Sequence, residues 1–232
     1  MRLFHRRKKD VFDPRTPWPE QPVPADAEAA AAGFWERWYE LLPEISAALG
    51  DREPQRFEHD LSRAVALVHP DLHFSLERGR RSIYALVVTG QEDPELRPYT
   101  DAWRAAAPAD DAIWEYHDSV PPVPDPAEVT VNLGAHRIAL ADVRVAAQVD
   151  QTEGVVDVAV HHPAFPELDE QTRTTLTFLP LDATLGERLA GERLRRVETA
   201  EAEPADSITL LELRELVRGL GEQSSEVVGP TG

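Results

Sequence analysis

Cysteine is absent from this chain of 232 residues, which excludes disulfide bonds, a thiolate nucleophile and cysteine-ligated metal sites. Lysine is almost absent, because Lys8 and Lys9 are the only two and every other basic residue is arginine. Such arginine-rich and alanine-rich usage is typical of bacteria with GC-rich genomes. No run approaches the roughly 20 apolar residues of a membrane-spanning helix. The basic start is followed by "DVFDPRTPWPEQPVP" rather than by an apolar signal sequence. We therefore expect a cytoplasmic protein.

The familiar signatures of catalysis and cofactor binding are also missing. The chain has no GxxxxGK[ST] phosphate loop, no GxGxxG, no HExxH and no GxSxG nucleophile elbow. We therefore expect no cofactor. The absence of these motifs argues against the commonest enzyme classes, without excluding a hydrolase whose ligands are scattered along the chain.

Negative charge dominates the composition, with 42 acidic and 24 basic residues and a formal net charge of −18. Residues 1–9 run against this trend, because they contain five bases and no acid: Arg2, Arg6, Arg7, Lys8 and Lys9. The acidic excess argues against nucleic acid as a partner, since that binding depends on neutralised phosphates. It favours a solvated surface or a basic protein partner. We expect residues 1–9 to be a disordered start, and Leu3 and Phe4 beside the bases leave a weak peripheral membrane anchor as the alternative.

Composition divides the chain into three parts. Residues 1–25 combine the basic cluster with a proline-rich stretch and predict a disordered tail and linker. Residues 26–221 predict a single domain, which is long enough to bury a hydrophobic core. Residues 222–232 predict a disordered C-terminal tail.

Apolar residues at helical spacing predict helices over residues 27–50, 51–69, 93–108, 167–179, 182–198 and 206–222. The predicted N-caps are Asp26, Asp51, Asp93 and, for the last helix, Asp206 or Ser207. Proline is expected to kink or split the first helix at Pro43 and to break the fourth at Pro180.

Alternating and continuous apolar runs predict strands within residues 72–77, 82–90, 112–118, 129–140 and 143–162. The last range is the clearest hairpin, with its turn at residues 152–154. The order of elements predicts an α+β fold, with a mainly antiparallel twisted sheet and helices packed mostly on one face. The two halves share a loose plan of a hairpin followed by a helix, without a repeat at residue level.

Several stretches together resemble an uncharacterised bacterial family, a domain of unknown function. They are "HPDLHFSL", "ALVVTGQEDPELRPYTDAW", "AAPADDAIWEYHDSVPP" and "LDATLGE", and they span roughly residues 65–190. The resemblance implies a shared α+β fold. It implies no activity, cofactor or catalytic residues.

Two adjacent histidines, His161 and His162, end the valine-rich strand of the last hairpin. Successive strand side chains point to opposite faces of a sheet, so a regular strand cannot direct both imidazoles at one metal ion. His162 continues the face of Val156, Val158 and Val160, and we expect it to be a hydrogen-bonded residue at the edge of the core. His161 shares the more polar face with Asp157.

Three predicted strands each carry a histidine and a carboxylate on one face: Asp71 with His73, Glu115 with His117, and Asp157 with His161. If these strands are neighbours with aligned faces, the side chains form a cluster that can bind Zn²⁺ or transfer protons. If the faces are solvated, they are the polar side of a one-sided sheet. The leading hypothesis is a non-enzymatic acidic binding or regulatory module that recognises a protein partner. The alternative is a metal-dependent hydrolase that uses the histidine–carboxylate cluster.

Overall fold

The computed structural model describes residues 22–134 and 136–226. Contacts divide the chain into two compact units, with the boundary between Val120 and Pro121. Each unit has its own hydrophobic core, so the single domain expected over residues 26–221 contains two cores. Most of the predicted N-terminal tail, including the five bases of residues 1–9, lies outside the described residues.

Unit 1 begins with a helical hairpin, α1 (Ala27–Asp51) and α2 (Gln55–Val68). Asp26 caps α1 as predicted, because its carboxylate accepts a hydrogen bond from the Ala29 amide at 3.0 Å. The assigned helix runs through Pro43 without splitting. The prediction that Asp51 caps the second helix is wrong. Asp51 is the last residue of α1, which ends where Arg52 adopts a left-handed conformation with φ 62°.

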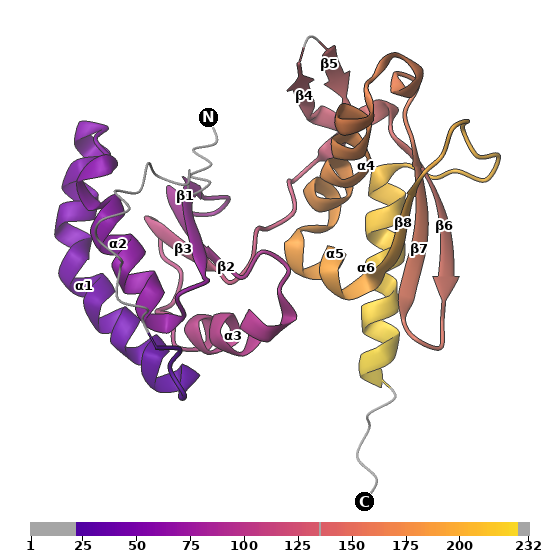
Figure 1. Ribbon diagram of the computed structural model, residues 1–232. Coiled ribbons are helices and arrows are strands. Elements are labelled where there is room, and N and C mark those ends of the chain that lie inside the picture. The colour runs from indigo at the N-terminus through magenta and orange to yellow at the C-terminus, as the bar shows by residue number, and fades with distance from the viewer. Residues whose placement is uncertain (1–21, 135, 227–232) are drawn as a thin grey trace, which may run out of the picture. The chain divides into compact units, whose positions relative to one another are not determined.

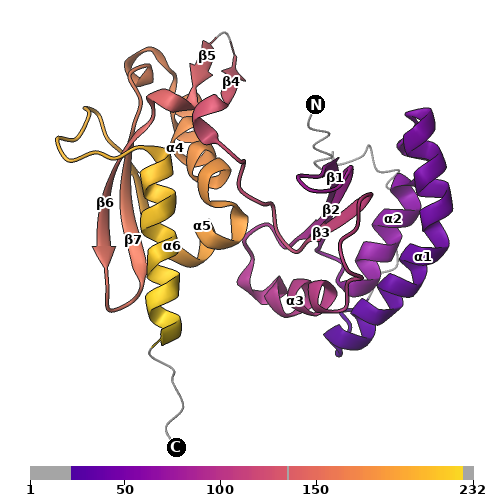
Figure 2. The same ribbon diagram turned by 180° about the vertical axis from the view of Figure 1, so that it is seen from behind.

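The sheet of unit 1 has three strands, β1 (His73–Arg78), β2 (Tyr84–Thr89) and β3 (Trp114–His117), with β2 in the centre. β1 and β2 form the predicted antiparallel hairpin, whereas β3 is parallel to β2. Helix α3 (Arg97–Ala105) makes the crossover between β2 and β3, after a short 3-10 turn that Asp93 caps. Figures 1 and 2 show α1 and α2 side by side against these strands.

Aromatic side chains fill the core between the helices and one face of this sheet. Trp35 and Trp38 of α1 pack against Trp103 of α3 and Tyr116 of β3. The Trp35 indole donates a hydrogen bond of 2.9 Å to the Trp103 carbonyl, which joins α1 to the crossover helix. Each buried aromatic side chain removes about 150–250 Å² from water, so this cluster dominates the packing of unit 1.

Unit 2 contains the hairpin β4 (Thr130–Leu133) and β5 (His136–Ala139) and a second sheet of β6 (Arg144–Asp150), β7 (Val155–His161) and β8 (Leu194–Thr199). Its helices are α4 (Glu170–Leu185), α5 (Glu187–Arg193) and α6 (Leu210–Glu226). Short 3-10 turns lie at Pro126–Glu128, Leu140–Asp142 and Phe165–Glu167.

The two three-stranded sheets have the same topology. In each, an antiparallel hairpin leads through helix to a third strand that pairs in parallel with the second. The core of unit 2 lies on the valine face of β7, where Val156, Val158 and Val160 pack with α4, α5 and α6. The predicted α+β class is confirmed, with three small sheets rather than one, and helices pack on one face of each three-stranded sheet (Figure 1).

Three local predictions in unit 2 are wrong. Helix α4 continues through Pro180, which is buried inside it. The predicted helix over residues 182–198 ends at Arg193, and Leu194–Thr199 forms β8 beside β7. Helix α6 is capped by Thr209 in a capping box. The Glu212 carboxylate accepts hydrogen bonds from the Thr209 amide and hydroxyl, and the Thr209 hydroxyl accepts one from the Glu212 amide. The helix ends at Glu226.

No helix among the described residues is long and apolar enough to cross a membrane.

Arg214 is a buried arginine that ties three segments of unit 2 together. Its guanidinium donates hydrogen bonds to the carbonyls of Thr184, Pro124 and Val123 at 2.7, 2.8 and 2.7 Å. We predict that Arg214→Ala lowers the free energy of unfolding by about 2 kcal/mol, because the buried Thr184 carbonyl and two partly buried carbonyls lose their donors. Urea unfolding followed by far-UV circular dichroism measures this change.

Arg218, an exposed residue on the same helix, provides the control. Arg218→Ala should change stability by less than about 0.5 kcal/mol. Equal effects of the two substitutions would refute the role of Arg214 in joining the three segments.

Candidate functional site

Two of the three predicted histidines lie on one face of the sheet in unit 1. His73 in β1 pairs with Thr89, and His117 in β3 pairs with Val87. The central strand β2 stands between them and their partners on it are two residues apart, so their backbones are roughly 12 Å apart at the usual strand spacing. The shared face is as predicted, but the sheet does not make these histidines neighbours.

Asp71 is not on that face, because β1 begins at His73. The Asp71 amide instead donates to Nδ1 of His69 at 3.2 Å. The predicted pairing of Asp71 with His73 on one strand is therefore wrong.

Asp157 in unit 2 is engaged by an arginine rather than by His161. Both carboxylate oxygens accept hydrogen bonds from Arg195, at 3.0 and 2.8 Å, and the same guanidinium also binds Asp150 and Glu153. The guanidinium lowers the pKa of Asp157. The arrangement is a salt-bridge network on the sheet face opposite the core, as in a one-sided sheet.

The two adjacent histidines differ in their partners. His162 lies at the core edge as predicted, with Nδ1 accepting from the Ala164 amide at 3.0 Å and Nε2 facing the Ala139 carbonyl at 3.3 Å. Burial lowers the pKa of His162, which favours the neutral ring. His161 is also buried, 9% exposed, with its ring near Phe165.

No three histidine, aspartate or glutamate side chains within residues 22–134 and 136–226 lie close enough together to hold a metal ion. The metal-dependent hydrolase therefore draws no support from the described side chains. The structure gathers other groups, at the opposite end of the β1–β2 hairpin from His73.

Glu115 is the most completely bound carboxylate of unit 1. It is 1% exposed and accepts hydrogen bonds from three consecutive backbone amides, those of Arg80, Arg81 and Ser82, at 2.9, 2.9 and 3.2 Å. Nε2 of His117 lies 3.1 Å from the same carboxylate. These four partners occupy its acceptor sites, so Glu115 anchors the turn between β1 and β2.

The electrostatics of Glu115 agree with this role. Burial acts to raise its pKa, but the hydrogen bonds from the turn amides and from His117 prevail and lower the pKa from 4.5 to about 2. A carboxylate this acidic is a poor general base near neutral pH. The turn itself needs Gly79, because a Cβ there would lie 2.5 Å from the Ser82 carbonyl oxygen.

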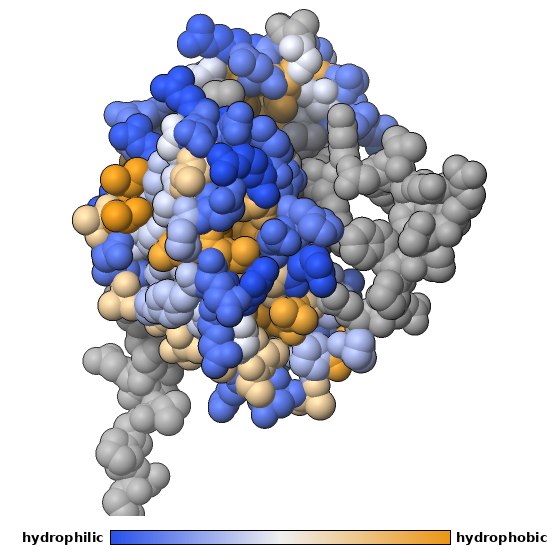
Figure 3. Space-filling model, turned by 90° about the vertical axis from the view of Figure 1, so that its left-hand side faces the viewer, coloured by the Kyte–Doolittle hydropathy of each residue, from blue (hydrophilic) through white to orange (hydrophobic). Residues whose placement is uncertain are grey.

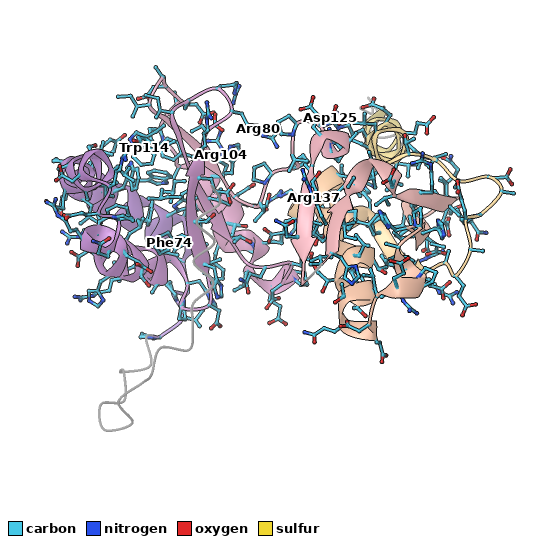
Figure 4. All side chains as sticks on the ribbon, turned by 90° about the horizontal axis from the view of Figure 1, so that it is seen from above. Phe74, Arg80, Arg104, Trp114, Asp125 and Arg137 are labelled. Carbon is cyan, nitrogen blue, oxygen red and sulfur yellow. The ribbon has the colours of Figure 1, made fainter. Side chains whose placement is uncertain are left out.

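A pocket of about 320 Å³ lies beside this turn. Its wall is formed by the end of α1, the start of α2 and the β1–β2 hairpin, through Leu49, Pro54, Phe57, Glu58, Phe74, Ser75, Leu76, Glu77, Arg78, Ile83 and Tyr84. The lining is mainly apolar, and the volume is at the lower end of the range for ligand pockets, about 300–1,000 Å³. Figure 4 shows Phe74 between the strands and the helices of unit 1.

The pocket reaches the outer edge of β1. Five consecutive residues of this strand, 74–78, line it. Because their side chains alternate between the two faces, one cavity can contact them all only at an edge of the strand. β2 occupies the other edge.

This outer edge carries backbone groups that β2 does not satisfy. The Gly79 amide donates to the Ile83 carbonyl, which fixes the alternation of the antiparallel ladder. The amides and carbonyls of Phe74, Leu76 and Arg78 therefore point away from β2. No strand in the described part of the chain pairs with this edge.

Carboxylates outnumber guanidinium groups around the pocket. Glu58 and Glu77 line it together with Arg78. Three further carboxylates, two on α1 and one between α1 and α2, share the guanidinium of Arg56: Glu44, Asp51 and Glu53. Residues 22–120 as a whole contain 19 acidic and 9 basic residues, a net charge of −10. Figure 3 shows the side that carries α1 and α2, which is mostly hydrophilic with several hydrophobic residues near its middle.

Sequence reasoning missed both the anchored turn and the pocket. The available signal was the buried sheet face that Glu115 shares with His117, together with the glycine and arginines of the "RGRRS" turn. A glutamate inside an apolar strand, opposite such a turn, suggests a carboxylate that binds backbone amides. The pocket has no comparable signal, because three separated segments form it.

Comparisons with models of known protein families, with curated proteins and with solved structures found no match to this chain. The resemblance to a domain of unknown function therefore stays a prediction.

We predict that Glu115→Gln lowers the free energy of unfolding by roughly 3 kcal/mol at pH 7, the equivalent of a pKa shift from 4.5 to about 2. The folded pKa lies below the unfolded value, so the stabilisation is complete above pH 4.5 and is lost as the pH falls through about 2. The difference in stability between the parent and Glu115→Gln should therefore shrink from pH 5 to pH 2. All five tryptophans lie within residues 1–120, so tryptophan fluorescence during urea unfolding reports on unit 1.

Glu36→Gln, at an exposed position of α1, is the control and should change stability by less than about 0.5 kcal/mol. A Glu115→Gln effect that does not depend on pH contradicts the anchoring role of the carboxylate charge.

Proposed function

We propose that the protein is a non-enzymatic binding module, in which unit 1 binds an extended, basic segment of a partner protein along the outer edge of β1. The observation that carries this proposal is the apolar pocket at a strand edge that no described strand occupies. Three properties of the edge support it: its backbone groups, its apolar surface and its charge.

The backbone groups favour an extended ligand. A peptide added as a strand, antiparallel or parallel to β1, would form a hydrogen-bond ladder with the outward amides and carbonyls of Phe74, Leu76 and Arg78. Strand addition of this kind is a common mode of peptide recognition, in which main-chain bonds contribute affinity and pockets select side chains.

The apolar surface favours a bulky hydrophobic anchor on that peptide. Ile83, which lines the pocket, is 57% exposed, and Ile113 is 50% exposed. The two lie at the same end of the sheet, because the amide of Tyr84, next to Ile83, donates to the Ile113 carbonyl at 2.9 Å. Burial of such a surface contributes about 25 cal/mol per Å², which makes one inserted aromatic or aliphatic side chain the main source of selectivity.

The charge favours a basic partner. A net charge of −10 over residues 22–120 attracts cations during diffusional encounter and repels nucleic acid. Glu58 and Glu77 bring carboxylates to the pocket itself. A cytoplasmic location, where a cysteine-free acidic module would meet basic partners, belongs to the same proposal.

We predict that Ile83→Lys weakens the binding of basic, aromatic-containing peptides about tenfold, because it places a charge on the apolar rim and opposes the basic ligand. The measurement is a titration of the full chain with short synthetic peptides that differ in net charge and in one hydrophobic residue. Amide chemical shifts of Phe74, Leu76 and Arg78 locate the contact by NMR.

Leu67→Lys is the matched control, since Leu67 is 53% exposed on α2 and does not line the pocket. It should leave peptide affinity unchanged. Peptides that bind without shifting β1 resonances, or that bind Ile83→Lys as tightly as the parent, would show that the partner site lies elsewhere. Selection of uncharged small molecules over peptides would replace the protein partner with a small ligand.

A further inference from the structure

We infer that residues 1–9 of this chain are an internal ligand for the outer edge of β1 and compete there with the partner segment. This inference rests on the proposed function and adds a regulatory contact to it. Residues 1–9 lie outside the described residues, so the inference is argued from their sequence, from the edge they would occupy and from the point where the described chain begins.

The chemistry of residues 1–9 matches the ligand that the edge favours. They contain five bases and no acid, and Leu3 and Phe4 stand beside the bases. They therefore combine a hydrophobic anchor with positive charge, whereas the pocket combines an apolar wall with Glu58 and Glu77. The charge of the segment is opposite to that of residues 22–120.

The connection is long enough for the contact. The described chain starts at Pro22, and the Pro24 carbonyl accepts a hydrogen bond of 2.8 Å from the Tyr99 hydroxyl, which fixes the start of the tether beside α3. Residues 10–21 can extend by about 3.3 Å each, or roughly 40 Å. The longest helix of unit 1, α1 with 25 residues, is about 38 Å long. Because Leu49, near the far end of α1, lines the pocket, the tether just spans this distance when it is fully extended.

Covalent attachment makes even a weak contact significant. A tethered ligand meets its site at an effective concentration that depends on how well the length of the tether matches the distance to be spanned. A site that is nine-tenths occupied by its own tail binds an external peptide with about tenfold lower apparent affinity. The tail would therefore set a threshold that a partner must exceed, and salt would lower this threshold by screening the charges.

The absence of cysteine allows a clean test on the full chain. His5→Cys gives a single attachment site for a nitroxide spin label among the bases. We expect selective broadening of the amide resonances of Leu76, Arg78 and Ile83, relative to the reduced label. Leu67, on α2 and outside the pocket lining, is the reference position and should broaden much less.

A second variant tests whether the bases of the tail, rather than its attachment to the chain alone, hold it at the edge of β1. In the labelled chain, Arg6→Gln, Arg7→Gln, Lys8→Gln and Lys9→Gln together should abolish the broadening and tighten the binding of the external peptide about tenfold. Uniform broadening, or none at β1 while the peptide still binds there, overturns the internal ligand and leaves the proposed function intact. Broadening at β1 in a chain that binds no external peptide overturns the proposed function instead. Recruitment of the labelled tail to anionic phosphatidylglycerol vesicles, with no broadening at β1, assigns the bases to a membrane surface and also overturns the inference.

Discussion

A buried carboxylate that binds three consecutive amides determines the shape of the β1–β2 turn, and the pocket depends on that turn. Glu115 reaches from β3 to the amides of Arg80, Arg81 and Ser82. This turn also fixes where β2 begins, and it therefore places Ile83 and Tyr84 at the pocket wall. The parallel pairing of β3 with β2 is essential to this arrangement, because it brings Glu115 level with Ala85 at the turn end of the hairpin. The candidate binding surface is thus a consequence of one charge-assisted hydrogen-bond network.

The two units use the same strand plan for different purposes. In unit 1 the sheet face opposite the helices is largely buried, with Ala85, Val87 and Glu115 at most 3% exposed. In unit 2 the corresponding face carries Asp157 and Arg195 in a partly exposed salt-bridge network, which contributes little to stability. Shared topology therefore does not imply a shared site. The buried glutamate of unit 1 has no counterpart at Asp157, whose partner is a side chain rather than a turn.

Strand alternation was the most reliable guide from sequence. It placed Glu115 with His117 on one face and Val156, Val158 and Val160 on the core face, as the structure has them. Helical spacing was less reliable, because Leu194 and Val197 are three residues apart, as on a helix face. A register shift in the pairing of β7 with β8 nevertheless places them opposite Val156 and Val158. Proline at position 180 predicts a break, but a helix interior held by tertiary packing can accommodate it. The histidine cluster failed for a topological reason, since face sharing within a strand does not specify which strands are neighbours.

The pocket could not be predicted, because its residues come from a helix end, a turn and a strand edge that are separated in sequence. Local patterns report on the face that each residue takes. They do not report on how closely the segment Leu49–Pro54 approaches Leu76.

The helix-like sequence of β8 has a consequence for the order of folding. The hairpin of β6 and β7 contains its own turn and can form locally, whereas the pairing of Leu194–Thr199 with β7 closes a longer loop that contains α4 and α5. Contacts that close a longer loop cost more chain entropy and are expected to form after local hairpins. β8 also holds Arg195, which joins Asp150 and Asp157 across the hairpin. We therefore expect β8 to pair after the β6–β7 hairpin has formed, and the ion network of Arg195 to be completed in that last step.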